Sequence, residues 1–109
     1  MIIVTITHHV RDGLIEAARR RIGENTVQMS RQPGFVFRHT GTPPGEPRRI
    51  VTLTAWASET DMARWDAAKR ASAAGESGAS VYERVERSIV EIDDERWGNV
   101  EGRRFQATS

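Results

Sequence analysis

The chain has no cysteine among its 109 residues, and its charges almost cancel: 16 basic and 15 acidic residues give a formal net charge of +1. The absence of cysteine excludes disulfides, thiolate catalysis and cysteine-based zinc sites. Balanced, interspersed charge argues against a nucleic-acid partner, which usually meets a concentrated basic surface. We therefore expect neither a disulfide-stabilised domain nor a nucleic-acid-binding protein.

Aromatic residues and long apolar runs are also scarce. The chain has three Trp, three Phe and one Tyr, and 38% of its residues are hydrophobic. One domain of this length has a modest core and often gains buried surface by forming oligomers. The apolar opening is far too short to cross a membrane, and no targeting segment is visible. We expect a cytoplasmic protein without a membrane partner.

Three segments in the first half predict a strand, a helix and a strand. Residues 1–10 are rich in β-branched side chains, which favours a strand. Asp12 is the expected N-cap of a helix that runs to about Arg31, where a Pro-Gly pair ends it. The aromatic segment 35–41 predicts the second strand.

The second half follows a connection that contains three prolines. Residues 50–57 predict a third strand, and Ser58 with Asp61 three residues later predicts the start of a second helix. Residues 71–80 are small and polar, which indicates a mobile loop. The segment 81–93 has apolar residues at helical spacing and then a strict alternation, so we expect a short helix that leads into the last strand.

The order strand, helix, strand, strand, helix, strand is typical of a ferredoxin-like α+β sandwich, an antiparallel sheet with both helices on one face. We expect this domain to span residues 1–92. Residues 93–109 are expected to form an arm that packs on the domain or on a partner subunit. The uncovered sheet face would be partly apolar, and a homodimer is the simplest way to cover it.

The two tryptophans of "AWASETDMARW" have different expected environments. Trp56 ends a strand on the same face as Ile50, which favours the core or a dimer interface. Trp65 follows Met62 by one helical turn and is expected to point inward, either as plain core or as a pocket wall. Its indole N–H needs a partner when it is buried, such as a substrate oxygen or a backbone carbonyl.

The second strand carries the first choice for a catalytic base. Strict alternation places Phe35, Phe37 and His39 on one side, and Val36 and Arg38 on the other. Histidine is the natural base near neutral pH, and His39 follows two aromatic residues near the end of a strand. A structural His39 and a solvated Arg38 are the alternatives, whereas an Arg38 in a pocket would hold an anionic substrate.

The pair His8-His9 supplies a second candidate. Adjacent strand residues point in opposite directions, so only one of the two histidines can share a given pocket. His9 is the next choice for a base after His39, and a surface or structural role is the alternative. The pair has the wrong geometry for a metal, and no carboxylate follows nearby, so we expect no metal site.

The stretches "PGFVFRHTG", "LTAWAS" and "SETDMARWDAAKR" together resemble the antibiotic biosynthesis monooxygenase (ABM) domain. The resemblance covers roughly residues 1–92. It implies a dimeric α/β barrel in which the sheets of two subunits face one another, with a pocket in each protomer between sheet and helices. Some members of that family oxidise aromatic polyphenols with molecular oxygen and no cofactor, whereas others bind and degrade haem.

The haem-degrading members share an Asn on the first strand, a Trp on the second helix and a His about three turns later. Here Trp65 stands in the Trp position, Thr7 or His8 stands where the Asn would be, and no His follows Trp65 in "DAAKRASAAGESG". Haem degradation is therefore disfavoured.

We expect a cofactor-independent monooxygenase that acts on a small aromatic or polyketide-like phenol. This chemistry needs a base, a hydrogen-bond donor for the developing anion and a dry aromatic site. The candidates are His39 and His9 as base, and Trp65, Phe37, Arg38 and Thr7 as substrate contacts, with no cofactor and no metal.

A non-catalytic binding protein or structural dimer on the same fold is the alternative. An RNA-recognition domain is disfavoured, because "GFVF" lies on the second strand instead of the third.

Overall fold

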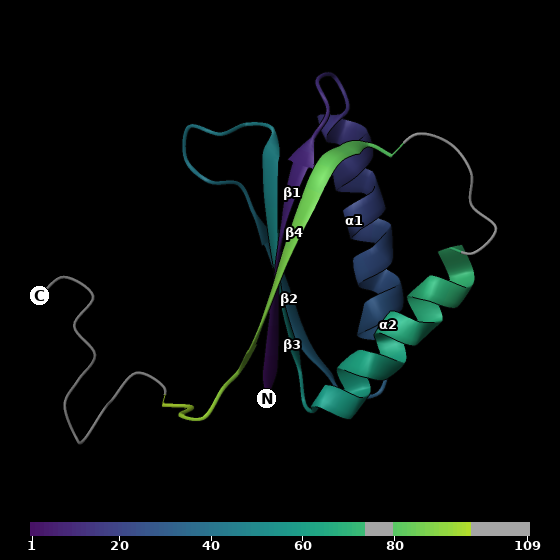
Figure 1. The fold of residues 1–109 in the computed structure, drawn as a ribbon, viewed down its shortest axis with the longest axis vertical. Coiled ribbons are helices and arrows are strands. Elements are labelled where there is room, and N and C mark those ends of the chain that lie inside the picture. Colours follow the sequence, from purple (N-terminus) through teal and green to yellow (C-terminus); the bar gives the residue numbers. More distant parts are fainter. Residues whose placement is uncertain (74–79, 97–109) are drawn as a thin grey trace, which may run out of the picture.

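The computed structural model describes residues 1–73 and 80–96. They form a four-stranded antiparallel sheet with the strand order β2-β3-β1-β4 (Figure 1). The elements are, in chain order, β1 (Ile2–Val10), α1 (Ile15–Ser30), β2 (Phe35–Gly41), β3 (Arg49–Trp56), α2 (Glu59–Ala73) and β4 (Tyr82–Glu91). This order and pairing confirm the predicted ferredoxin-like α+β fold.

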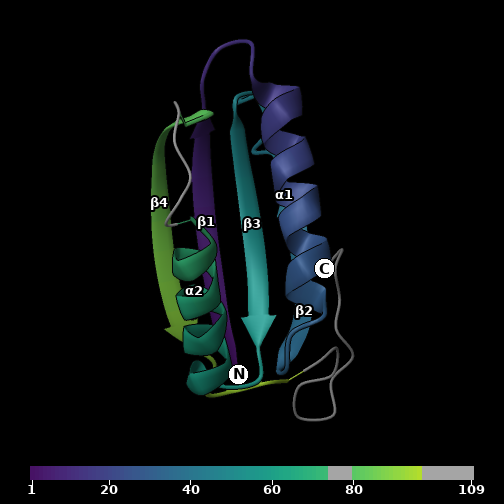
Figure 2. The ribbon, with the colours of Figure 1, turned by 90° about the vertical axis from the view of Figure 1, so that its right-hand side faces the viewer.

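Both helices lie on the same side of the sheet, as Figures 1 and 2 show from two directions. In Figure 2, α1 runs beside β3 and β2, and α2 lies in front of β1 and β4. An ion pair of 2.7 Å between Arg87 of β4 and Asp66 of α2 joins that helix to the edge strand. We call the covered side of the sheet the helix face and the other side the open face.

The alternation of side chains along the central strand β1 decides which residues meet the helices. Ile2 and Val4 pack against residues of both helices, which places the even-numbered positions of β1 on the helix face. The helix face of β1 consists of Ile2, Val4, Ile6, His8 and Val10, and its open face consists of Ile3, Thr5, Thr7 and His9.

The core on the helix face is divided into two apolar clusters. The first consists of Ile2, Val4, Met29, Trp56, Met62 and Trp65, and the second consists of Val10, Ala18, Ile22 and Ile50. Trp56 is 1% exposed and packs edge-to-face against Phe35, with ring centroids 5.9 Å apart. Of the two environments expected for Trp56, the structure shows the core.

The two helices begin differently. At α2 the backbone N–H of Asp61 donates to Ser58 Oγ at 3.2 Å, and Ser58 Oγ donates to the Asp61 carboxylate at 2.8 Å, so the predicted start is confirmed. At α1 the predicted Asp12 cap is wrong. The N-cap is Leu14, without a side-chain hydrogen bond, because Asp12 and the positive-φ Gly13 form a turn first.

The predicted short helix before the last strand is wrong as well, because β4 runs without interruption from Tyr82 to Glu91. Val85 and Ile89 pair with His8 and Val4 of β1. A spacing of four residues fits one face of a strand as well as one face of a helix, and the pairing with β1 selects the strand.

The expected grouping of Phe35 with Phe37 and His39 is also wrong. The pairing of β2 with β3 shifts between Phe35 and Phe37, as a β-bulge does when it inserts one residue. Phe35 packs on the first apolar cluster, whereas Phe37 lies opposite Ala55 on the open face. Arg38 therefore shares the helix face with Phe35.

Two predictions fall largely outside the described residues. The loop predicted at 71–80 includes residues 74–79, and most of the predicted arm lies in residues 97–109. At the end of the predicted domain, the Ile92 N–H donates to the Met1 carbonyl at 2.8 Å. Within residues 1–73 and 80–96, no helix is long and apolar enough to cross a membrane.

Candidate functional site: a buried polar cluster under helix α1

Polar side chains gather on the helix face between the two apolar clusters. β1, β2, β3 and β4 each contribute one of them, and α1 contributes two. We call this group the buried polar cluster; it consists of the buried His8 and Thr52 and of the half-buried Asn25, Thr26, Arg38 and Tyr82. Polar groups in such a place require hydrogen-bond partners.

The two ring nitrogens of His8 differ, because only Nδ1 is bonded to the backbone. The ring is 7% exposed, and Nδ1 lies 3.0 Å from the backbone carbonyl of Ile50. A carbonyl oxygen only accepts, so Nδ1 carries the proton and Nε2 keeps its lone pair. Burial lowers the pKa of His8 below the ordinary 6.5, the Ile50 hydrogen bond opposes this shift, and the Arg38 charge adds to it. His8 is therefore neutral at pH 7 and able to accept a proton.

Tyr82 stands beside His8 with its ring centroid 4.9 Å away and the ring planes at 47°. Burial raises the pKa of Tyr82 above its ordinary value of 10.0, and the charges of Arg21 and Arg38 oppose this shift. The hydroxyl therefore keeps its proton near neutral pH and is a hydrogen-bond donor.

Arg38 enters the cluster from β2 and is held by α1. Its Nη1 donates to Thr26 Oγ1 at 3.0 Å, and the Thr26 hydroxyl donates to the Ile22 carbonyl at 2.7 Å. Burial lowers the pKa of Arg38, and Tyr82 opposes that shift. The guanidinium nevertheless stays charged at pH 7, because arginine is not deprotonated in proteins.

Three atoms of the cluster are buried without a hydrogen-bond partner among the described residues: Asn25 Oδ1, Arg38 Nε and Thr52 Oγ1. An unsatisfied buried polar group costs about 1–3 kcal/mol. Three such atoms on three different elements favour a polar ligand that binds among them. With a neutral histidine beside them, the cluster can deprotonate a phenol or enol and hold the resulting anion.

Of the six residues predicted for the site, Arg38 and Trp65 lie on the helix side of the sheet. Trp65 is 7% exposed and belongs to the first apolar cluster, with its ring centroid 6.3 Å from that of Trp56. The Lys69 ammonium lies 5.8 Å above the Trp65 ring. Trp65 and Lys69 line a groove of about 320 Å³ between α1 and α2, together with Gln28, Arg31, Gln32 and Ala68.

The other four predicted residues lie on the open face. Thr7 is opposite Val51 of β3, and His39 is opposite Leu53. The rings of Phe37 and His39 are in contact, with centroids 4.9 Å apart. The structure thus brings Phe37 and His39 together and separates them from Trp65 and Arg38 by the thickness of the sheet.

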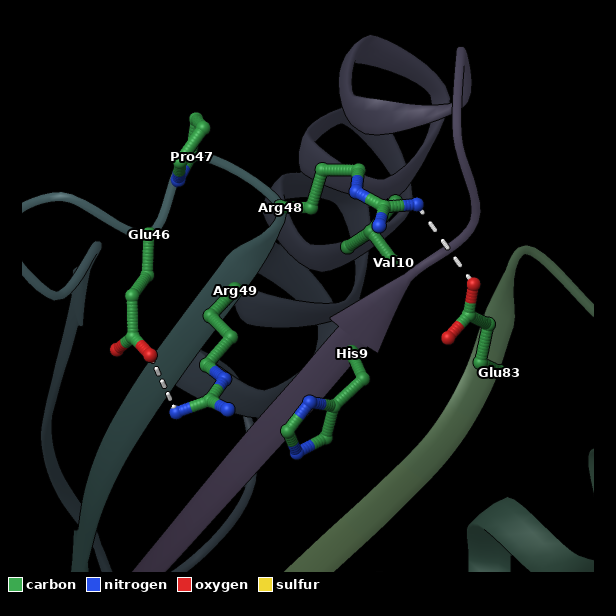
Figure 3. A pocket seen from close by; sticks show the side chains of 7 residues that line it. All are labelled: His9, Val10, Glu46, Pro47, Arg48, Arg49 and Glu83. Atoms are coloured by element: carbon green, nitrogen blue, oxygen red, sulfur yellow. Dashed lines mark ion pairs between the residues drawn. The ribbon is translucent and has the colours of Figure 1, made fainter.

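His9 lies at the rim of an ionic surface on the open face. Its Nε2 is 2.7 Å from a carboxylate oxygen of Glu86. It also lines an open pocket of about 250 Å³, shown in Figure 3 with His9, Val10, Glu46, Pro47, Arg48, Arg49 and Glu83. Ion pairs cross this pocket from Arg49 to Glu46 at 2.7 Å and from Arg48 to Glu83 at 3.7 Å.

Sequence reasoning missed His8 as a site residue, together with Asn25, Thr26, Thr52 and Tyr82. The signal for His8 was present, because it shares a face with Ile2, Val4 and Ile6, the most apolar face of the strand. Tyr82 carried no such signal, since its segment was expected to start as a helix. The bulge in β2 hid the fact that Arg38 points toward the helices.

The model of the antibiotic biosynthesis monooxygenase (ABM) family matches residues 1–77. Among curated proteins, no sequence matches this chain. The haem degrader MhuD from Mycobacterium tuberculosis, solved with two haems in its active site, has a TM-score of 0.68 and 20% identity over 87% of this chain and 99% of its own. A mutant of SnoaB, a cofactor-independent oxygenase from Streptomyces nogalater, has a TM-score of 0.70 and 15% identity over 86% of this chain and 94% of its own. At these identities the structures establish the shared fold, and the family match covers most of the chain. The chain belongs to the antibiotic biosynthesis monooxygenase family.

Proposed function

We propose that the protein is a cofactor-independent monooxygenase that acts on a small phenolic or quinol substrate bound at the buried polar cluster, with His8 as the base. One observation carries this proposal. His8 is buried with Nδ1 bonded to a backbone carbonyl, so its Nε2 keeps a lone pair that can accept a proton. Family membership and the fold shared with SnoaB support the same reaction class.

In this reaction His8 Nε2 takes a proton from a phenolic or enolic O–H. The Tyr82 and Thr52 hydroxyls are the donors for the negative charge that develops on the substrate. The electron-rich anion reduces molecular oxygen directly. One oxygen atom becomes a carbonyl oxygen on the ring, and the other leaves as water with two hydrogens of the substrate. The two flanking apolar clusters keep bulk water away from these steps.

His39 is the second candidate for the base, and His9 the third. A base at His39 requires the substrate to bind on the open face, where Phe37 supplies an aromatic contact and Thr7 a hydroxyl. Trp65 then lies on the other side of the sheet and makes no substrate contact. The His8 proposal is favoured, because it uses the polar atoms that have no partner.

The open face is proposed to be the interface of a homodimer. Phe37, Leu53 and Val90 place apolar side chains there, and Val90 is 51% exposed. Interfaces of obligate dimers commonly bury more than ~2,000 Å². Such an interface would place one buried polar cluster in each subunit, on the outer side of the paired sheets.

Oxygen uptake with a panel of anthrones and hydroquinones tests the proposed activity. We expect uptake with at least one phenol and no change in the absorbance spectrum of haemin when the protein is added. Uptake by none of the phenols, with tight binding of the same compounds, would instead support a binding protein on this fold. A shifted haemin spectrum followed by loss of the porphyrin band would assign the protein to haem degradation.

A further inference from the structure

Arg38 is half-buried and has no carboxylate partner among the described residues, whereas Arg11 and Arg19, which bond to the Ser80 carbonyl and the Thr42 hydroxyl, are exposed. Six arginines form ion pairs with carboxylates: Arg48, Arg49, Arg64, Arg84, Arg87 and Arg96. Arg38 instead donates a hydrogen bond to the Thr26 hydroxyl, and burial lowers its pKa. A desolvated cation without a counter-ion is costly, which indicates that the negative charge is supplied by a ligand.

The contacts of Arg38 also indicate the shape of the group that it would bind. Thr26 occupies Nη1, and Nε is buried without a partner. Nε and Nη2 form one edge of the planar guanidinium, with two parallel N–H bonds that match the two oxygens of a carboxylate. The hydroxyl oxygen of a phenol would fill only one of these two positions.

We propose that the substrate is an aromatic carboxylic acid whose carboxylate is bound by the Nε edge of Arg38, with its phenolic or enolic group placed at His8. This inference rests on the proposed function and goes further by naming the charged group that the substrate carries. Arg38 is then a specificity-determining residue. His8 acts on a neutral hydroxyl, whereas Arg38 binds a charge that is present throughout the reaction.

Two product-like probes test this inference without turnover: 1,8-dihydroxyanthraquinone and the same molecule with a carboxylate at ring carbon 3. Affinities are measured by calorimetry with the full-length protein. A charge-assisted hydrogen bond contributes about 1.5–3 kcal/mol, so we expect the acid to bind about 10–150-fold more tightly than the neutral quinone. Arg38→Met should remove this preference and change the affinity for the neutral quinone by no more than about threefold.

Arg31→Met is the matched control, because Arg31 is a cation in the groove beside Trp65 and not in the buried polar cluster. It should keep the full preference for the acid. Arg38→Lys, which keeps the charge but loses the fork, should retain only part of the preference.

Equal affinity of the wild type for both quinones would overturn the inference, and so would loss of the preference in Arg31→Met. If Arg38→Met lowers the affinities for the acid and for the neutral quinone to the same extent, the inference is also contradicted. Arg38 would then support the structure of the site without binding the carboxylate. If Arg38→Met does not fold, the wild-type comparison and Arg38→Lys decide the question. Because oxygen uptake is not measured, a failure of the proposed chemistry leaves this result unaffected.

Discussion

His8 and His9 are neighbours in the chain, yet they lie on opposite faces of the sheet in opposite environments. His8 points under the helices, where its Nδ1 is bonded to the Ile50 carbonyl and burial lowers its pKa. His9 points to the open face, where its Nε2 is paired with the exposed carboxylate of Glu86. The same side chain is buried and bonded to a backbone carbonyl on one face, and bonded to an exposed carboxylate on the other.

The other side chains of the two faces differ in a similar way. On the helix face, apolar clusters accompany three buried polar atoms that have no hydrogen-bond partner within residues 1–73 and 80–96. On the open face, apolar side chains such as Phe37 and Leu53 alternate with paired charges such as Arg84 and Glu86. Catalysis is proposed on the helix face and subunit assembly on the open face.

The largest expected effect is the loss of turnover in His8→Gln. Removal of a general base lowers a proton-transfer rate by about 10²–10⁴-fold. His39→Gln should leave turnover within a few-fold of the wild type, because the His39 ring is on the open face. Oxygen uptake under saturating substrate measures both variants. A large loss in His39→Gln together with wild-type turnover in His8→Gln would move the active site to the open face.

The next largest effect is on stability, and it differs between an aromatic residue of the helix face and one of the open face. Trp56→Ala should lower the free energy of unfolding by roughly 3–5 kcal/mol, because it leaves a cavity in the first apolar cluster. Phe37→Ala should cost less, since Phe37 is only partly buried within one subunit. Urea denaturation at a fixed protein concentration measures both. A near-neutral Trp56→Ala would contradict the core position of this side chain.

A charge on the open face should break the proposed dimer. Leu53→Glu places a carboxylate opposite Thr5 and His39, where two sheets would meet. We expect a shift to monomer in sedimentation experiments at micromolar concentration. Val27→Glu, at an exposed position of α1, is the control and should remain a dimer. A wild-type protein that is a stable folded monomer at this concentration would refute the assignment of the open face.

The smallest effect is on the pH dependence of stability. The pKa of His8 is below 6.5 in the folded protein, so the unfolded chain binds a proton more readily between the two values. The free energy of unfolding should therefore fall as the pH decreases from 6.5 toward the folded pKa. Above pH 6.5 the stability that depends on neutral His8 is fully present. His8→Gln should flatten this part of the profile, as denaturant titrations at several pH values would show. An unchanged slope would place the titration elsewhere.

The order of the elements was predictable, because β-branched alternation and the Ser58 signal are local features of the chain. The sequence did not predict which side of the sheet each residue of β2 faces. A single inserted residue reverses the alternation after Phe35. The buried polar cluster was not predictable either. Its members come from five elements, and only the tertiary fold brings Arg38 to Thr26 and Tyr82 to His8.

The most direct test of the central claim is a long-range ¹H–¹⁵N correlation spectrum of the histidine rings, recorded across a pH titration and assigned with His8→Gln. The account predicts that His8 is neutral at pH 7 with its proton on Nδ1, and that it titrates below 6.5. A proton on Nε2 would leave no lone pair facing a substrate, and a titration midpoint above 7 would leave the ring mostly protonated at pH 7; either result would contradict the role of His8 as the base.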